Sequence, residues 1–165
     1  MNVSARVATV GDLPDLLHMY RLLAAEMVPL EGTWPTATGL PAPEDEAFTD
    51  LMASGDSTVL IGEMDGTALG FLIGAREALP PQARGARIGS VRYIFTEPGA
   101  REIGVGEAML EAYLALERDD GIALFDAHVA PGHRLTKNFF ESKGFSARSI
   151  VMHRNDEQNW EKDTP

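Results

Sequence analysis

The chain has 165 residues, 44% of them hydrophobic and 24% charged, which is the composition of one folded domain with a sizeable core. It has no cysteine, which excludes disulfides, thiolate metal sites and a cysteine nucleophile, and we expect no metal. Its formal net charge of -11 argues against general nucleic-acid binding, and no apolar run is long enough to span a membrane. We therefore expect a cytoplasmic protein without a nucleic-acid or membrane partner, whose charged substrate, if it has one, is cationic.

Apolar periodicity alternates along the chain between the strand and the helix pattern. The predicted strands are 3–7, two strands within 58–77 that turn at Asp65-Gly66, 86–98, 122–130 and 145–154, and the predicted helices are 12–27, 44–54, 106–118 and 133–143. This order predicts a mixed α/β (α+β) domain around one sheet over residues 3–155, followed by a polar tail at 156–165. Residues 28–43 hold four prolines and are predicted to form a long loop, a kind of segment that is often functional.

Residues 101–106, REIGVG, lie between a predicted strand and a predicted helix, where a phosphate could bind. A dinucleotide-binding loop would need Gly or Ala where Met109 stands, and a P-loop would need Lys where Glu107 follows Gly106. Both nucleotide motifs are therefore excluded. Two interpretations remain: a diphosphate site made of bare amides at a helix start, or a turn that uses glycine only for its backbone freedom.

A longer stretch around this loop resembles the cofactor motif of the GNAT superfamily of acyl-CoA-dependent N-acetyltransferases. In IFTEPGAREIGVGEAMLEAYL, the family pattern is matched by Pro98, Arg101, Gly104 and Gly106. A second block, HRLTKNFFESKGF, is similar to the family's Asn-x-x-Ala-x-x-x-Tyr-x-x-x-Gly-Phe and matches its last two residues at 144–145. The order of elements also agrees with the family fold, a central, mostly antiparallel twisted sheet whose central strands splay apart between flanking helices.

The resemblance implies that the cofactor is acetyl-CoA and that its pyrophosphate binds the amides of the loop, those of Arg101, Glu102, Ile103, Gly104, Val105 and Gly106. It also implies that the strand 90–96 splays from the strand around His128, so that backbone groups near Phe95 and Thr96 pair with the pantetheine arm and polarise the thioester carbonyl. A free amine would then attack the thioester directly.

Three positions depart from the family pattern, so neither the general acid nor the general base is evident. Phe140, which the resemblance places beside the thioester sulfur, replaces a tyrosine that often protonates the leaving thiolate. His133 replaces the asparagine that begins the helix, and it either contacts the cofactor or only caps the helix. Ser90 stands where some members carry a glutamate base.

Three side chains are candidates for the missing proton transfers. The ordinary pKa of histidine suits His128 as a base, although a strand histidine more often has no catalytic role. His133 is the second candidate, at the start of its helix. Tyr93 has a proton to donate, although an aromatic residue on a central strand more often packs in the core.

Two classes of function remain compatible with these features. The first is an enzyme that transfers an acetyl group from acetyl-CoA to a primary amine of a small molecule or a protein. The second is an acyl-CoA-binding sensor or partner subunit with little activity, which the loss of the tyrosine at Phe140 keeps open. Acidic residues at the ends of the loop 28–43 favour a cationic acceptor, and a homodimer is a possible assembly.

Overall fold

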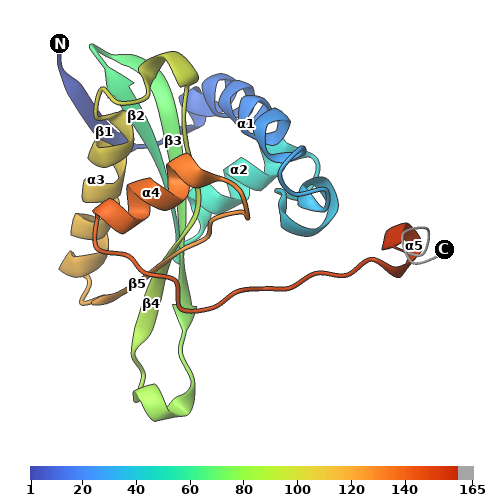
Figure 1. Cartoon of the computed structure of the whole chain (residues 1–165). Coiled ribbons are helices and arrows are strands. Elements are labelled where there is room, and N and C mark those ends of the chain that lie inside the picture. Colours follow the sequence, from blue (N-terminus) through green and yellow to red (C-terminus); the bar gives the residue numbers. More distant parts are fainter. Residues whose placement is uncertain (160–165) are drawn as a thin grey trace.

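A computed structural model of the chain describes residues 1–159 and shows one twisted sheet with helices on both faces (Figure 1). In the described part, the strands are β1 (Val3–Val7), β2 (Ser57–Met64), β3 (Thr67–Ala78), β4 (Arg87–Thr96) and β5 (Leu124–Ala127), which lie in that order across the sheet. The first three neighbouring pairs are antiparallel, and β4 pairs with β5 in parallel. This confirms the predicted mixed α/β fold with a mostly antiparallel sheet.

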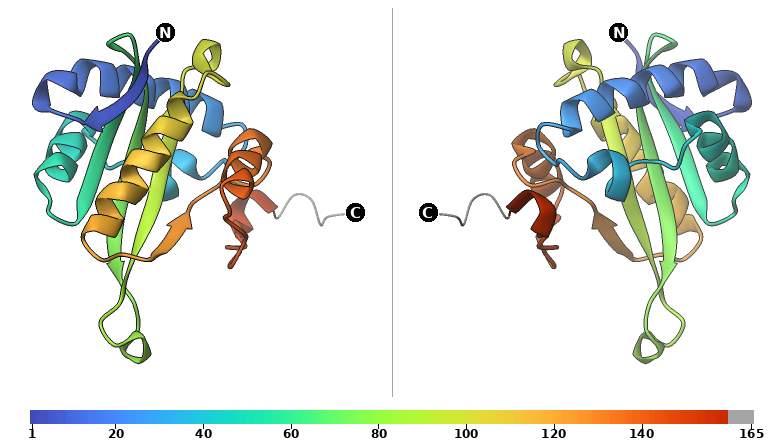
Figure 2. Two further views of the ribbon diagram at one scale, coloured as in Figure 1. Left: turned by 90° about the vertical axis from the view of Figure 1, so that its left-hand side faces the viewer. Right: turned by 90° about the vertical axis from the view of Figure 1, so that its right-hand side faces the viewer.

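The helices form one layer on each face of the sheet (Figure 2). They are α1 (Leu13–Met27), α2 (Glu44–Ala53), α3 (Val105–Asp119) and α4 (Arg134–Ser142), whereas the short α5 (Asp156–Asn159) lies away from the sheet (Figure 1). Short turns are η1 (Val10–Asp12), η2 (Trp34–Thr38), η3 (Pro81–Ala83) and η4 (Pro98–Ala100). Side chains of α1 and α2 pack on one face of β2 and β3, and side chains of α3 and α4 pack on the other. Because residues of a strand point alternately to the two faces, Ile61 and Leu60 belong to different core clusters.

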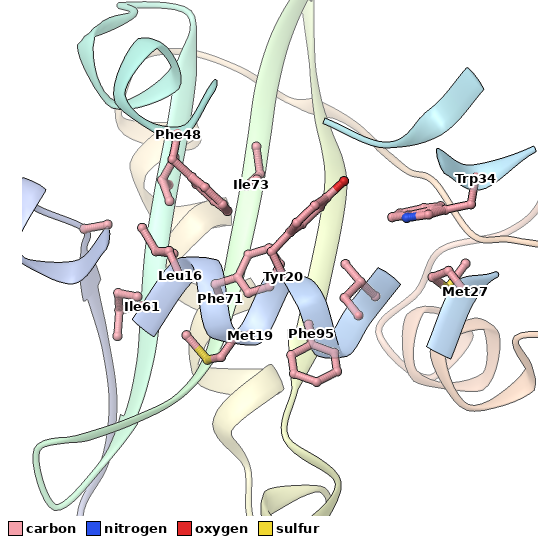
Figure 3. Packing of buried hydrophobic residues seen from close by; sticks show 13 residues of the cluster. Leu16, Met19, Tyr20, Met27, Trp34, Phe48, Ile61, Phe71, Ile73 and Phe95 are labelled. Carbon is pink, nitrogen blue, oxygen red and sulfur yellow. The ribbon is translucent and has the colours of Figure 1, made fainter. Parts of the chain in front are cut away.

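The core under α1 and α2 is built largely from aromatic rings (Figure 3). Tyr20 of α1 meets Phe48 of α2 edge to face at 6.0 Å between ring centroids, and Phe48 meets Phe71 of β3 at the same distance. The segment 28–43 joins this core, because the η2 turn buries Trp34 to 5% exposure. The predicted long loop is thus folded onto the sheet rather than free.

Glycines on β2 and β3 let α3 lie directly on the sheet. A Cβ at Gly62 would fall 2.6 Å from Cγ1 of Val105, and a Cβ at Gly74 would fall 2.3 Å from the ring of Tyr113. Both distances are shorter than any van der Waals contact, so these positions accept no side chain. Since Val105 is the first residue of α3, this close packing also fixes where the helix begins.

Replacing Gly74 with Ala should therefore destabilise the protein by about 1–3 kcal/mol, the usual effect of overpacking a core. The matched control is Gly55→Ala, where an added Cβ meets nothing within 4 Å. We expect thermal unfolding to show a lower Tm for Gly74→Ala and an unchanged one for Gly55→Ala. Equal Tm values for the two variants would contradict the close approach of α3.

The last predicted strand is wrong. Residues 145–154 form neither helix nor strand and pair with no strand of the described chain, although the sequence predicted a strand there (Figure 1). A strand needs a hydrogen-bonding neighbour as well as a suitable sequence, and this segment leaves the sheet. The domain limits 3–155 stay a prediction. Of the predicted polar tail, residues 156–159 form α5, and residues 160–165 lie outside the described part of the chain.

Candidate acyl-CoA site

The two central strands separate in the middle of the sheet. Pairing between β4 and β5 runs from Ile88 with Leu124 to Val91 with Ala127, and the last contact is the bond from the His128 amide to the Val91 carbonyl at 3.0 Å. β4 then continues for five residues to Thr96 with no strand of the described chain on that side. The predicted splay between these strands is therefore present.

Beyond this fork, the point where β4 and β5 separate, β4 directs backbone groups to the gap, and of these the Thr96 carbonyl accepts a bond from Arg101. The Glu97 amide donates to Leu69 of β3 at 2.8 Å, and Phe95 pairs with Phe71 two residues earlier, so both face β3. Successive residues of a strand direct their backbone groups to opposite sides, so those of Ile94 and Thr96 face the gap. A ligand lying in the gap would find them in the position of a missing strand.

The loop after β4 exposes a row of amides at the start of α3. Gly104 has φ of 94° and caps the helix, and Glu102 also has a positive φ of 71°. Within residues 1–159, no protein atom accepts a hydrogen bond from the amides of 102–107, whereas the Arg101 amide reaches the Pro98 carbonyl at 3.4 Å. Unpaired amides at a helix start, with the positive end of the helix dipole behind them, bind phosphates well.

The side chain of Arg101 turns back toward the sheet and α1. Its Nε donates to the Thr96 carbonyl at 3.1 Å, and its guanidinium lies 5.8 Å from the ring centroid of Phe95. Its NH2 group bonds Oε2 of Glu26 at 2.5 Å, and Oε1 of Glu26 lies 2.9 Å from Nε2 of His133. One carboxylate of α1 therefore joins the phosphate loop to the first residue before α4.

Sequence reasoning missed Glu26 altogether. It occupies the last turn of α1, where a glutamate is usually a solvated residue, yet its side chain is 25% exposed. Arg101 and His133 follow it by 75 and 107 residues, so no spacing in the sequence signals the contact. The structure thus links Arg101 and His133, two predicted site residues, through Glu26, which was not predicted.

The other catalytic candidates lie near the fork. His128 follows β5 directly, and partial burial together with the charge of Arg92 lowers its pKa, which leaves the imidazole neutral at physiological pH. Tyr93 lies on β4, where its hydroxyl donates to the Thr38 carbonyl and its ring meets Trp34 edge to face at 5.5 Å. Burial raises the pKa of Tyr93 to about 12.

Three further residues of the predicted set are buried. Phe140 is 3% exposed and lies between Phe139 and Phe145, each at 5.2 Å between ring centroids, in the core under α3. The side chain of Phe95 packs in the opposite core and its backbone groups face β3, so at the gap it is its neighbours Ile94 and Thr96 that present backbone groups. Ser90, which stands where some family members carry a glutamate base, is fully buried.

Elsewhere the described chain offers little for binding. A hollow lined in part by Arg76, Glu117 and Asp120 lies toward the other end of β3, but these three charges are bonded to one another. Among residues 1–159 there is no group of three His, Cys, Asp or Glu side chains that could hold a metal ion. No helix in that range is long and apolar enough to cross a membrane.

Residues 19–145 match the model of the acetyltransferase (GNAT) family. The chain belongs to this family. No curated protein matches it. The solved structures similar to it include a transcriptional regulator from Bacillus halodurans C-125, at 20% identity and a TM-score of 0.74, covering 93% of this chain and 100% of that one.

Two further solved structures are those of acetyltransferases with ligands. A predicted acetyltransferase from Clostridium acetobutylicum with acetyl-CoA is 16% identical, with a TM-score of 0.72 and coverage of 95% of this chain and 98% of that one. An aminoglycoside acetyltransferase from an uncultured soil metagenomic sample, in complex with sisomicin, is 14% identical, with a TM-score of 0.68 and coverage of 93% and 94%. At these identities the likeness shows a shared fold.

The phosphate loop generates a prediction that separates binding from folding. Gly106→Val should weaken acetyl-CoA binding about tenfold or more, because its Cβ would project beside Oγ1 of Thr96, 3.6 Å away, at the mouth of the gap. Gly104→Val should weaken it too, but it also forces a β-branched residue into a positive φ. Calorimetric titration with acetyl-CoA measures the affinities, and thermal unfolding reports the strain.

The matched control is Gly99→Val in the same loop, where an added Cβ meets nothing within 4 Å and φ is not positive. It should bind acetyl-CoA like the parent. If Gly106→Val bound as tightly as Gly99→Val, the assignment of residues 101–106 to the phosphate would fail.

Proposed function

We propose that this protein is an N-acetyltransferase that moves an acetyl group from acetyl-CoA to a primary amine. The observation that carries the proposal is the row of unpaired amides at 102–107 at one end of a gap between strands that is open from Val91 to Thr96. Acetyl-CoA has a diphosphate and an amide-bearing arm that match these two parts. The bound acetyl-CoA in the Clostridium acetobutylicum structure, which shares the fold, supports the same choice of cofactor.

In this proposal, the diphosphate binds the amides of the loop and the pantetheine arm runs along β4 as an added strand. The amides that face the gap, those of Ile94 and Thr96, then donate to the arm and to the thioester oxygen. Fixed amide dipoles stabilise the negative charge that develops on this oxygen during attack. His133, held by Glu26, lies between the loop and α4 and borders the same path.

The reaction needs a neutral amine, because its lone pair forms the new bond to the carbonyl carbon. The C–N bond forms, the C–S bond breaks, CoA leaves as a thiolate, and the nitrogen gives up one proton. His128 lies at the fork and is neutral at physiological pH because burial lowers its pKa. We assign it the role of the base that accepts this proton, directly or through water.

This role fixes the pH dependence. A base must be unprotonated, so kcat/KM should fall as pH drops through the pKa of His128, which lies below its ordinary value of 6.5. His128→Gln should lower kcat by about 10²-fold or more, and it should remove the part of this fall that comes from His128, leaving only the part that comes from protonation of the amine. The control is His153→Gln, an exposed histidine outside the site. An unchanged pH profile of kcat/KM in His128→Gln would rule His128 out as the base.

The acceptor is proposed to be a cationic amine. The chain has a net charge of -11. Glu31 accepts hydrogen bonds from the hydroxyls of Thr33 and Thr38. The carbonyl of Thr38 in turn accepts a hydrogen bond from Tyr93, so this segment lies beside the fork. The first turn of α2, which follows this segment, adds Glu44, Asp45 and Glu46. The sisomicin complex of the metagenomic relative supports an amine-bearing acceptor class. A cytoplasmic location and a homodimer stay predictions from the sequence.

Thiol release from acetyl-CoA with a panel of amines tests both the activity and the acceptor class. A polyamine or a lysine-containing peptide should react faster than an acidic amino acid, and KM for the cation should rise with salt because exposed carboxylates are screened. Glu31→Gln should raise that KM, whereas Asp50→Asn on the exposed surface of α2 should not. Tight binding of acetyl-CoA without turnover of any amine would instead identify a sensor or partner subunit.

A further inference from the structure

The segment that contains α4 is basic, although the chain as a whole is acidic. Residues 133–143 hold Arg134, Lys137 and Lys143 against one acid, Glu141, and they include two of the three lysines in the sequence. The whole chain has a net charge of -11. Positive charge gathered in one place on such a chain raises the local concentration of an anion there.

The end of α4 lies beside the start of α3. Lys143 donates a hydrogen bond from its Nζ to the carboxylate of Glu107, which is in the first turn of α3. The ring of Phe139 lies 3.8 Å from the position that a Cβ on Gly106 would take. These contacts place the Lys143 ammonium next to the amides of 102–107, to which the diphosphate is assigned.

The backbone that carries Lys143 is fixed by the turn that ends α4. Gly144 has φ of 88°, and its amide bonds the Glu141 carbonyl at 3.1 Å. The Phe145 amide bonds the Phe140 carbonyl at 3.1 Å, and the two rings meet at 5.2 Å between centroids in the core under α3. A helix end of this kind presents its last side chains in a defined direction. Lys143 is thus positioned before any ligand binds.

The two partners of this ion pair differ in exposure. The side chain of Lys143 is 23% exposed, whereas that of Glu107 is 56% exposed. An ion pair at the surface contributes little free energy, so an anion of higher charge can replace the carboxylate. The more exposed Glu107 can then turn into water while Lys143 keeps its place. The Glu107 carboxylate therefore occupies a position that suits a phosphate.

CoA carries a diphosphate and, on its ribose, a third phosphate as a monoester. We propose that Lys143 binds this 3′-phosphate in exchange for Glu107. The inference rests on the proposed function, which sets the direction of the ligand: with the arm along β4 and the diphosphate on 102–107, the ribose lies beyond the loop. A phosphate monoester carries a charge of about -1.5 to -2 at neutral pH, so it competes well with a single carboxylate.

This contact determines which thioesters the protein prefers. The arm and the diphosphate are the same in acetyl-CoA and in its 3′-dephospho form, so only Lys143 distinguishes the two ligands. A thioester on a carrier protein also lacks the 3′-phosphate and gains nothing from Lys143. The protein should therefore select free acetyl-CoA.

Calorimetric titration with acetyl-CoA and with acetyl-3′-dephospho-CoA tests the assignment. The parent should bind acetyl-CoA about tenfold or more tightly than the dephospho form, the usual effect of one charge-assisted hydrogen bond. Lys143→Gln should weaken acetyl-CoA binding and leave the dephospho form almost unaffected, so that the ratio approaches one. Thermal unfolding should show little change, because the substitution removes only a surface ion pair.

The matched control is Lys137→Gln, which removes the same charge from α4. Lys137 is 58% exposed and bonds Glu141 of its own helix, so the ratio of the two affinities should stay that of the parent. An equal loss of both affinities in Lys143→Gln would refute a contact with the 3′-phosphate. A parent that binds both forms equally well would overturn this inference and leave the proposed function standing, whereas a parent that binds neither would overturn both.

Phosphorus NMR locates the contact independently of affinity. The 3′-phosphate resonance of acetyl-CoA, which is distinct from those of the diphosphate, should shift on binding to the parent. With saturated Lys143→Gln, the diphosphate resonances should still shift and the 3′-phosphate resonance should stay near its free position. The same 3′-phosphate shift in the parent and in Lys143→Gln would contradict the assignment.

Discussion

The candidate site depends on the point at which β4 stops pairing with β5. β4 has a register shift against β3, where Ile73 pairs with Tyr93 and Gly74 with Val91, so that Arg92 is an extra residue. Such a bulge bends the strand and reverses which side the following backbone groups face. Before it, the Val91 carbonyl binds His128 on β5, and after it, Phe95 pairs with β3 and leaves its neighbours facing an open gap. One inserted residue therefore leaves the end of β4 unpaired on the side where the candidate site lies.

Glu26 of α1 links the loop after β4 to the start of α4 through Arg101 and His133. The side chains of Glu26, Arg101 and His133 are 25%, 28% and 13% exposed, so their ionic and hydrogen bonds are partly shielded from water. Such bonds are stronger than the same contacts on an open surface. Arg101 also bonds the Thr96 carbonyl, so the carboxylate, the loop and the end of β4 are fixed as a unit. The loop 101–106 and the start of α4 thus have a common anchor on α1.

Short sequence motifs predicted those features of the fold that depend only on residues adjacent in the sequence. The hairpin at Asp65-Gly66 has φ of 50° and 81°, the turn for which this dipeptide is suited, and the glycines of REIGVG lie where a helix start needs them. The sequence did not reveal Glu26, because its partners are 75 and 107 residues away and pairing over such distances follows from tertiary packing. The segment 145–154 was predicted as a strand from its local sequence, and a local sequence cannot show whether a strand has a hydrogen-bonding neighbour.

The same packing argument bears on how the leaving group would depart. A tyrosine at position 140 would place a hydroxyl among Phe139, Phe145 and the core under α3, where it would need a partner to offset its desolvation. Phe140 therefore fits a role in the core and has no proton to give to the leaving CoA. The hydroxyl of Tyr93 is already bonded to the Thr38 carbonyl, and its pKa of about 12 is far above that of a thiol, which is about 8.5. Tyr93 would thus give up its proton to a thiolate only at an energetic cost. Departure as the free thiolate avoids that transfer, and it leaves removal of the amine proton as the one step that needs a base from this protein.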